Sequence, residues 1–272
     1  MLRRHAIAAL LAARAWAKPM DRFFEGAHGT AVLVDRASRR LLTAHAPQLA
    51  GAAMAPPGST LKPLILNALL ERGALRETDR FPCSGDLRIA GRSFACSHPP
   101  LGEPVNARTA IAYSCNAFVS HYAARTAPGE VAATLSRCGL TSRTGWFGAS
   151  EATGRTWNAS AELQALGEHG ILITPAGLAM AYARLLERAH PAVLGGMEDA
   201  VEFGTAQRAR VAGLKVAGKT GTAHAKDGSV LAWFAGFTPG AVIVVMLQGR
   251  SGGADAAPIG GRILAAHSRG EL

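Results

Sequence analysis

The sequence predicts an α+β fold: an antiparallel sheet built from N- and C-terminal strands, flanked by helices, with a helical subdomain inserted between its two halves. Three observations predict it: a β-like alternation near the N-terminus, a long middle part with helical periodicity, and three β-rich runs near the C-terminus. Consecutive strands joined by short turns pair antiparallel, and helices must then cover the sheet.

The N-terminal elements are a hairpin and a helix. Residues 29–42 alternate apolar and polar side chains around a polar turn, which is typical of a β-hairpin. A loop rich in Gly, Ala and Pro leads to Ser59, where an apolar periodicity begins that predicts a helix to residue 72. Residues 80–105 are rich in Gly, Pro, Ser and Cys and predict a loop with a hairpin inserted in it.

The middle of the chain predicts the helical subdomain. Two short helices are expected within residues 106–127, meeting near Ser114, and another over 129–138, before a glycine. Residues 175–188 form a strongly amphipathic helical pattern with a proline in its first turn. Residues 197–210 predict one more helix.

The C-terminal part predicts the rest of the sheet. Residues 211–219, 229–237 and 241–248 are β-rich and are separated by Gly, Asp and Pro turns, and residues 256–267 predict a closing helix.

Composition excludes several classes of protein. The chain has 272 residues, 49% hydrophobic and 18% charged, which excludes collagen, coiled coil and global disorder. No apolar run approaches the ~20 residues of a membrane span. The net charge is +10, but the arginines are scattered and no nucleic-acid-binding motif is present, so we expect no nucleic-acid partner.

The N-terminus predicts export. Residues 1–17 contain two arginines near the start, a short apolar run and a final Ala-Trp-Ala, the pattern of a secretory signal peptide. We expect cleavage before Lys18, a single catalytic domain over 18–272, and a periplasmic or cell-envelope location. A short uncleaved anchor and a frayed N-terminal helix are the alternatives.

The cysteines and histidines give no sign of a metal or cofactor site. The nine histidines are not paired at metal-ligand spacing, and the four cysteines form no C-x-x-C pair. Because an exported protein can form disulfides, we expect a Cys83–Cys96 disulfide that closes the hairpin loop. Cys115 is expected to be a buried packing thiol, and the pairing of Cys115 and Cys138 stays open.

One nucleotide-binding motif is present but lacks its context. Residues 213–220 fit G-x-x-x-x-G-K-T, the phosphate-binding loop that joins a strand to a helix. Residues 221–228 look like a turn rather than a helix, so we do not expect nucleotide binding.

Three other motifs form an ordered set. S-x-x-K occurs once, at Ser59–Lys62, S-x-N once, at Ser114–Asn116, and K-T-G once, at Lys219–Gly221. Each motif alone is weak, and each has a simple structural explanation: helix caps for the serines and Asn116, and a surface position at a strand end for Lys219. Their joint occurrence in a chain with an export signal points to one chemistry.

That chemistry is acyl transfer by an activated serine. Residues three apart share one face of a helix, so we expect the Lys62 amine to lie over the Ser59 hydroxyl. The amine can take the hydroxyl proton if burial and nearby positive charge keep it partly neutral. Lys219 can supply that charge and bind a substrate carboxylate. Ser114 can relay protons, and Asn116 can bind a substrate amide.

The K-T-G strand supplies the remaining substrate contacts. Thr220, Gly221 and Thr222 are expected to bind substrate, and the backbone N–H groups of Ser59 and Thr222 to form an oxyanion hole.

These motifs resemble the penicillin-binding transpeptidase domain, the serine acyltransferases of peptidoglycan cross-linking. The resemblance runs from about Gly29 to the C-terminus, and further stretches of the chain share it, at residues 57–64, 83–99, 110–118, 167–183, 233–239 and 256–259. It implies a β-lactamase/transpeptidase-like fold, no cofactor, peptidoglycan stem peptides as substrates and β-lactams as inhibitors. Only about ten residues separate the expected cleavage site from the first strand, so we expect no glycan polymerisation.

The leading interpretation is a D,D-transpeptidase or D,D-carboxypeptidase that acts on D-Ala-D-Ala termini through a Ser59 acyl-enzyme. A non-catalytic penicillin-recognising sensor is an alternative, and a serine β-lactamase is another. A β-lactamase needs a deacylation base, and no E-x-x-L-N motif is present. Glu151 is expected in a loop, and Glu162 and Glu168 as exposed residues flanking a helix. We therefore expect a long-lived penicilloyl adduct.

Overall fold

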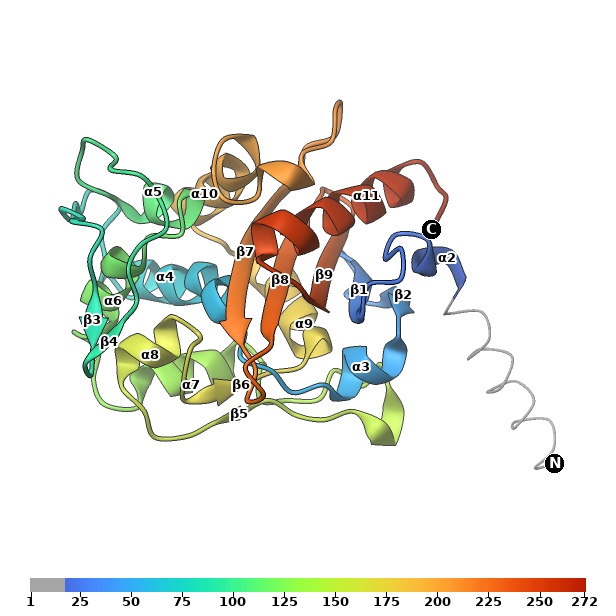
Figure 1. The fold of residues 1–272 in the computed structure, drawn as a ribbon, viewed down its shortest axis with the longest axis horizontal. Helices are drawn as coiled ribbons and strands as arrows, with labels where there is room; N and C mark the ends of the chain where they lie inside the picture. Colours follow the sequence, from blue (N-terminus) through green and yellow to red (C-terminus); the bar gives the residue numbers. More distant parts are fainter. Residues whose placement is uncertain (1–17) are drawn as a thin grey trace.

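The computed structural model describes residues 18–272, and its centre is a five-stranded antiparallel sheet with the order β2-β1-β9-β8-β7 (Figure 1). The strands come from the two ends of the described chain, as predicted. They are β1 (Gly29–Asp35), β2 (Leu41–His45), β7 (Ala217–His224), β8 (Val230–Phe237) and β9 (Ala241–Gln248).

Both faces of the sheet are covered, and alternate residues of each strand enter different cores. Val32 and Val34 face one core, whereas Ala31 and Leu33 face the other. Helix α9 (Pro175–Leu185) lies on the first face and α11 (Ala257–Ser268) on the second. Because side chains on both faces are buried, β9 is almost entirely apolar.

The inserted subdomain lies beside β7, on the left of Figure 1. Its helices pack on the core that includes Val32, and two small hairpins complete it. The described helices other than α9 and α11 are α2 (Lys18–Asp21), α3 (Pro47–Ala52), α4 (Lys62–Glu71), α5 (Ala107–Ala112), α6 (Asn116–Ala123), α7 (Glu130–Arg137), α8 (Ala161–Ala165) and α10 (Pro191–Glu202). The short strands are β3 (Arg88–Ile89), β4 (Arg92–Ser93), β5 (Arg155–Thr156) and β6 (Ile171–Leu172).

Three predicted boundaries differ from the structure. The helix expected from Ser59 begins as a 3₁₀ turn, η1 (Gly58–Leu61), before α4. The helix expected over 197–210 is α10, which begins at its first-turn Pro191, followed by a separate 3₁₀ turn, η3 (Gln207–Ala209).

The third difference concerns the K-T-G segment. The strand expected over 211–219 is β7, which begins only at Ala217, because Val211 and Leu214 form an isolated bridge around a turn. Gly221–His224, which look turn-like in the sequence, belong to β7 and pair with β8. The K-T-G motif is therefore the middle of a strand, which also excludes the helix that a phosphate-binding loop requires.

No helix within residues 18–272 combines the length and the apolar character that crossing a bilayer requires. The predicted export signal, residues 1–17, lies outside the described residues.

Candidate active site

The three motifs meet at a cavity of about 500 Å³ between β7 and the subdomain. Ser59 comes from the 3₁₀ turn before α4, Ser114 and Asn116 from the junction of α5 and α6, and the last motif from β7. Most of the predicted site residues line the cavity, together with residues that the sequence did not indicate. The lining residues are Ser59, Ser97, Ser114, Asn116, Glu168, Thr205, Thr220, Gly221, Thr222, Ser251 and Gly253.

Two glycines let β7 approach the turn that carries Ser59. Gly58 has a φ of 54°, and a Cβ there would lie 2.6 Å from the Thr222 carbonyl oxygen. A Cβ on Gly221 would lie 2.6 Å from the Pro57 carbonyl oxygen. The backbone of the strand therefore packs directly on the backbone of the turn, and only glycine fits at either position.

Lys62 is fully buried and joins the first motif to the second. Its Nζ donates to the Ser114 carbonyl oxygen (2.6 Å), to Ser114 Oγ (3.1 Å) and to Asn116 Oδ1 (2.5 Å). Burial lowers the pKa of Lys62 to about 8, so a neutral amine is accessible near neutral pH. The amine can therefore accept a proton from a hydroxyl beside it.

Ser114 is held in an uncommon backbone conformation. Its φ is 59°, in the left-handed region that non-glycine residues seldom occupy. Cys115 follows as the N-cap of α6, and its sulfur accepts the Phe118 N–H. The break between α5 and α6 turns both oxygens of Ser114 toward Lys62, a local strain that is common at functional sites.

Lys219 is also fully buried, and its Nζ donates to the Thr220 carbonyl oxygen (2.9 Å). Burial and the positive charge of Lys62 lower the pKa of Lys219 well below its usual range. The sequence predicted that burial and the charge of Lys219 would together lower the pKa of Lys62. Burial does lower it, whereas the repulsion between the two amines lowers the pKa of Lys219 instead.

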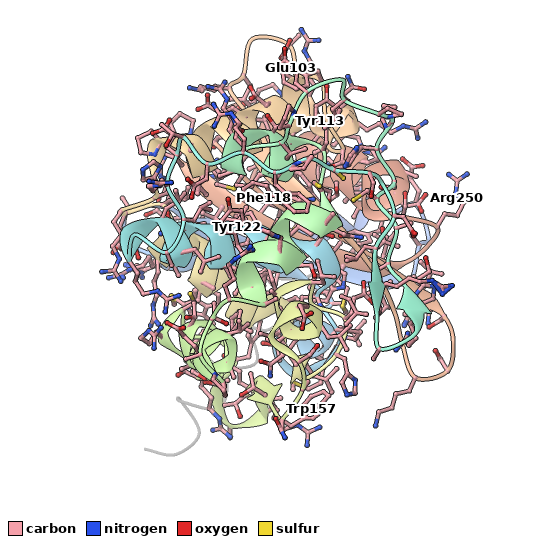
Figure 2. The ribbon with its side chains drawn as sticks, turned by 90° about the vertical axis from the view of Figure 1, so that its left-hand side faces the viewer. Glu103, Tyr113, Phe118, Tyr122, Trp157 and Arg250 are labelled. Carbon is pink, nitrogen blue, oxygen red and sulfur yellow. The ribbon has the colours of Figure 1, made fainter. Side chains whose placement is uncertain are left out.

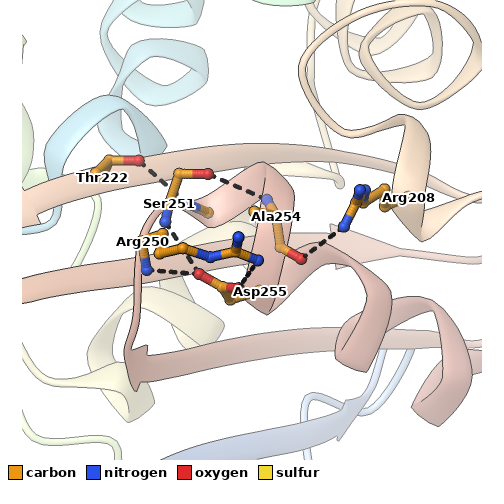
Figure 3. A network of polar contacts seen from close by, with 7 residues as sticks. Arg208, Thr222, Arg250, Ser251, Ala254 and Asp255 are labelled. Atoms are coloured by element: carbon orange, nitrogen blue, oxygen red, sulfur yellow. Dashed lines mark hydrogen bonds and ion pairs between the residues drawn. The ribbon is translucent and has the colours of Figure 1, made fainter.

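The turn after β9 covers the third motif (Figure 3). The Gly252 N–H donates to Thr222 Oγ1 (3.1 Å), and the Asp255 carboxylate accepts the backbone N–H groups of Arg250 and Ser251. These contacts fix the Ser251 edge of the cavity, which no sequence motif indicated.

Glu168 was expected to be exposed, and that expectation is wrong. It is half-buried and lines the cavity, because Gly167 packs on the nucleophile turn and accepts the Gly58 N–H at its carbonyl (3.1 Å). Burial raises the pKa of Glu168, while the charges of His224 and Lys62 oppose that rise. The four-residue run Gly-Glu-His-Gly, with glycines at both ends, is the only sequence signal for this close approach.

Glu151 has a structural role instead. It is 2% exposed and accepts the backbone N–H groups of Thr144 (2.5 Å) and Gly145 (2.9 Å). Its place in a loop agrees with the sequence, and its contacts tie that loop together. Glu162 lies in the first turn of α8 and is half-buried rather than exposed.

The expected Cys83–Cys96 disulfide is wrong. All four cysteines are free, and the Cys83 and Cys96 sulfurs are 3.7 Å apart, whereas a disulfide bond is about 2.05 Å long. Cys115 is buried, as predicted, but its sulfur faces those of Cys83 and Cys96 rather than apolar side chains alone. This cluster, like the Ser251 edge of the cavity and the position of Glu168, was not indicated by the sequence.

Comparison with known proteins agrees with the fold. The family profile "Penicillin binding protein transpeptidase domain" matches residues 29–265. No curated protein matched the sequence at a significant level.

Solved structures share the architecture at low sequence identity. Pseudomonas aeruginosa PBP2 in complex with WCK 5153 superposes with a TM-score of 0.80 at 20% identity, covering 92% of this chain and 76% of that one. PBP2 from the Helicobacter pylori complex with MreC superposes with a TM-score of 0.79 at 19% identity, covering 94% of this chain and 63% of that one. A peptidoglycan glycosyltransferase from Burkholderia ambifaria gives 0.81 at 20% identity, covering 93% of both chains.

Proposed function

Because the chain belongs to the penicillin-binding protein transpeptidase family, we propose that it is an exported serine acyltransferase acting on D-Ala-D-Ala termini of peptidoglycan stem peptides. One observation carries the proposal: Ser59, Ser114 and the K-T-G strand line one cavity, with the Lys62 amine hydrogen-bonded to Ser114. β-Lactams are the expected inhibitors, since they present a strained amide to the same serine.

In the proposed acylation, Ser59 Oγ attacks the carbonyl carbon of the penultimate D-Ala while its proton passes to the Lys62 amine. The pKa of Lys62 near 8 supports this role, because a base works best close to the operating pH. Collapse of the tetrahedral intermediate breaks the C–N bond. The departing amine takes a proton from Lys62 through the Ser114 hydroxyl, and a Ser59 ester remains.

The strand β7 supports the substrate-binding part of the proposal. It is an edge strand of the sheet, the position at which an extended peptide can add as a further strand. The Thr222 backbone touches Gly58, next to Ser59, which suits an oxyanion hole made by the Ser59 and Thr222 N–H groups. Burial disfavours charge on Lys219, and a substrate carboxylate would reverse that preference on binding.

The ester can be resolved by an amine, giving a cross-link, or by water, giving a carboxypeptidase. Glu168 favours hydrolysis as a second candidate function, because a carboxylate lining the cavity can hold and deprotonate water. The same residue decides the lifetime of a penicilloyl adduct: the expected long lifetime holds only if Glu168 does not activate water at that ester.

One experiment separates these functions. A peptide ending in D-Ala-D-Ala is incubated with the protein, with and without an amine acceptor, and the products are identified by mass spectrometry. Amide product formed with acceptor supports the transferase. Formation of free acid supports hydrolysis if its rate falls at least tenfold in Glu168→Gln and stays unchanged in the matched control Glu162→Gln. If neither product forms and the protein still acylates with penicillin, the sensor interpretation replaces both.

Export is part of the proposal and has its own test. The Ala-Trp-Ala sequence predicts that the mature chain begins at Lys18. N-terminal sequencing of protein recovered from the cell envelope is expected to start there, and a sequence that starts at Met1 would support an anchor instead.

A further inference from the structure

Three thiols and one imidazole converge beside the second motif. Cys83 precedes β3, Cys96 and His98 follow β4, and Cys115 caps α6, so the cluster joins the small hairpin to the α5–α6 junction. The sulfur–sulfur distances are 3.7 Å (Cys83–Cys96), 3.7 Å (Cys96–Cys115) and 3.5 Å (Cys83–Cys115). His98 Nε2 is 3.8 Å from the Cys83 sulfur.

These distances match the edges of a metal-centred tetrahedron. Zinc binds thiolate sulfur at about 2.3 Å, which places two sulfurs of a tetrahedral site about 3.8 Å apart. All four ligand atoms lie within 4.8 Å of one another. A disulfide between any two of the sulfurs would leave the third thiol and His98 without an explanation.

We propose that Cys83, Cys96, His98 and Cys115 bind one Zn²⁺ ion in a closed, four-ligand structural site. The proposal goes beyond acyl transfer and does not rest on it, because a site with four protein ligands keeps no open position for a substrate.

Hydrogen bonds around the cluster suit that role. Each sulfur accepts one backbone N–H: Cys83 from Gly85 (3.4 Å), Cys96 from Ala117 (3.5 Å) and Cys115 from Phe118 (3.4 Å). Such donors stabilise thiolate ligands.

The imidazole is oriented in the same way. His98 Nδ1 lies 2.8 Å from the Pro99 carbonyl oxygen, so this nitrogen donates and Nε2 keeps its lone pair for the cluster. Zinc-binding histidines usually donate their second nitrogen to a carbonyl or carboxylate.

The ion would fasten the hairpin to the active site. Cys115 lies between Ser114 and Asn116, and Asn116 Nδ2 donates to the hairpin carbonyl of Phe94 (2.9 Å) and more weakly to Ala95 (3.3 Å). Figure 2 shows this side of the molecule, with sulfur atoms in yellow near the labelled Phe118. A four-ligand metal site would add to the packing of Ile89 and Phe94 on the core, which otherwise holds this short hairpin in place.

The test uses the full chain purified under reducing conditions. Metal analysis is expected to give about one zinc per chain, and replacement by Co²⁺ to give thiolate charge-transfer bands and intense tetrahedral d–d bands. Cys83→Ser and His98→Ala should each weaken zinc binding by more than the ~10- to 100-fold typical of losing an outer hydrogen-bond partner. Cys138→Ser, which removes the cysteine outside the cluster, should bind zinc as the wild type does.

Thiol labelling gives a readout that does not depend on the variants folding. In the zinc-loaded wild type the three cluster thiols are expected to be protected, and chelation should make all three reactive and lower the Tm. Cys138 is expected to react slowly in both states, because burial raises the pKa of its thiol to about 11. Failure of the reduced wild type to bind Zn²⁺ or to give tetrahedral Co²⁺ bands would overturn the proposal, as would equal zinc binding by Cys83→Ser and the wild type.

Discussion

The two walls of the cavity are held in place by different forces. The strand wall, Thr220–Thr222, is part of a regular ladder in which Thr220 lies opposite Phe234 and Gly221 opposite Trp233. The helix wall, Ser114–Asn116, is a strained break between short helices, held by Lys62 and by the hairpin. Backbone pairing fixes the first wall, whereas a few side-chain contacts fix the second.

The difference predicts where the site is fragile. Changes to the strand wall must disturb a buried sheet and should lower stability and activity together. Changes to the helix wall remove single contacts, so they should lower activity with less effect on the fold.

Lys62→Arg tests the helix wall and has the largest expected effect. Arginine keeps the positive charge but cannot act as a base, so acylation by penicillin should slow by about 100- to 10,000-fold. Stopped-flow or mass-spectrometric acylation rates measure this. The matched control is Lys215→Arg, at an exposed lysine that pairs with Glu198. An equal fall in acylation rate in the control, or no fall in Lys62→Arg, would remove Lys62 from the mechanism.

Gly221→Ala tests the strand wall. The new Cβ would lie 2.6 Å from the Pro57 carbonyl oxygen, so the strand and the nucleophile turn must separate. A displacement of about 1 Å can slow a reaction about 100-fold, and overpacking costs about 1–3 kcal/mol of folding stability. Acylation rate and Tm should both fall, whereas Gly240→Ala, where the nearest atom is 3.8 Å away, should change neither.

The pH dependence of acylation sharpens the role of Lys62 without a substitution. Burial lowers its pKa to about 8, so the neutral, basic form predominates only above that pH. Below pH 8 the rate should rise about tenfold per pH unit, because the fraction of neutral amine does so, and then level off. An acylation rate that does not change with pH from roughly 6 to 9, the range around that pKa, would contradict Lys62 as a titrating base.

Tyr182→Phe should have the smallest effect of the set. Its buried hydroxyl donates to the Thr60 carbonyl oxygen (2.7 Å), which links α9 to the nucleophile turn. Losing one such hydrogen bond costs about 1 kcal/mol and leaves an acceptor unpaired. Chemical denaturation should show that loss of folding stability. The rate of acylation by penicillin, measured separately, should stay close to that of the wild type.

The strand wall and most of the fold were predictable because periodic burial leaves a local pattern. Alternation predicted β1 and β2, and the apolar run of β9 follows from burial on both faces. The motifs predicted that Ser59 and Asn116 belong to one site, and both line the cavity. The boundary of β7 was missed because the turn at residues 211–214 has a β-like composition.

The helix wall was only partly predictable, since its contacts join residues far apart in the sequence. Cys83 and Cys115 are 32 positions apart, and nothing local marks them as neighbours. Glu168 was assigned to the surface because its position depends on Gly167 packing against Gly58, a contact between distant segments.

The central claim, that Ser59 is the acylated nucleophile, is tested most directly by intact-protein mass spectrometry after incubation with penicillin. We expect the wild type to gain the mass of one penicillin molecule, with the adduct mapped to the peptide that contains Ser59, and folded Ser59→Ala to gain none. An adduct of the same mass on Ser59→Ala, or on a different residue of the wild type, would contradict the account.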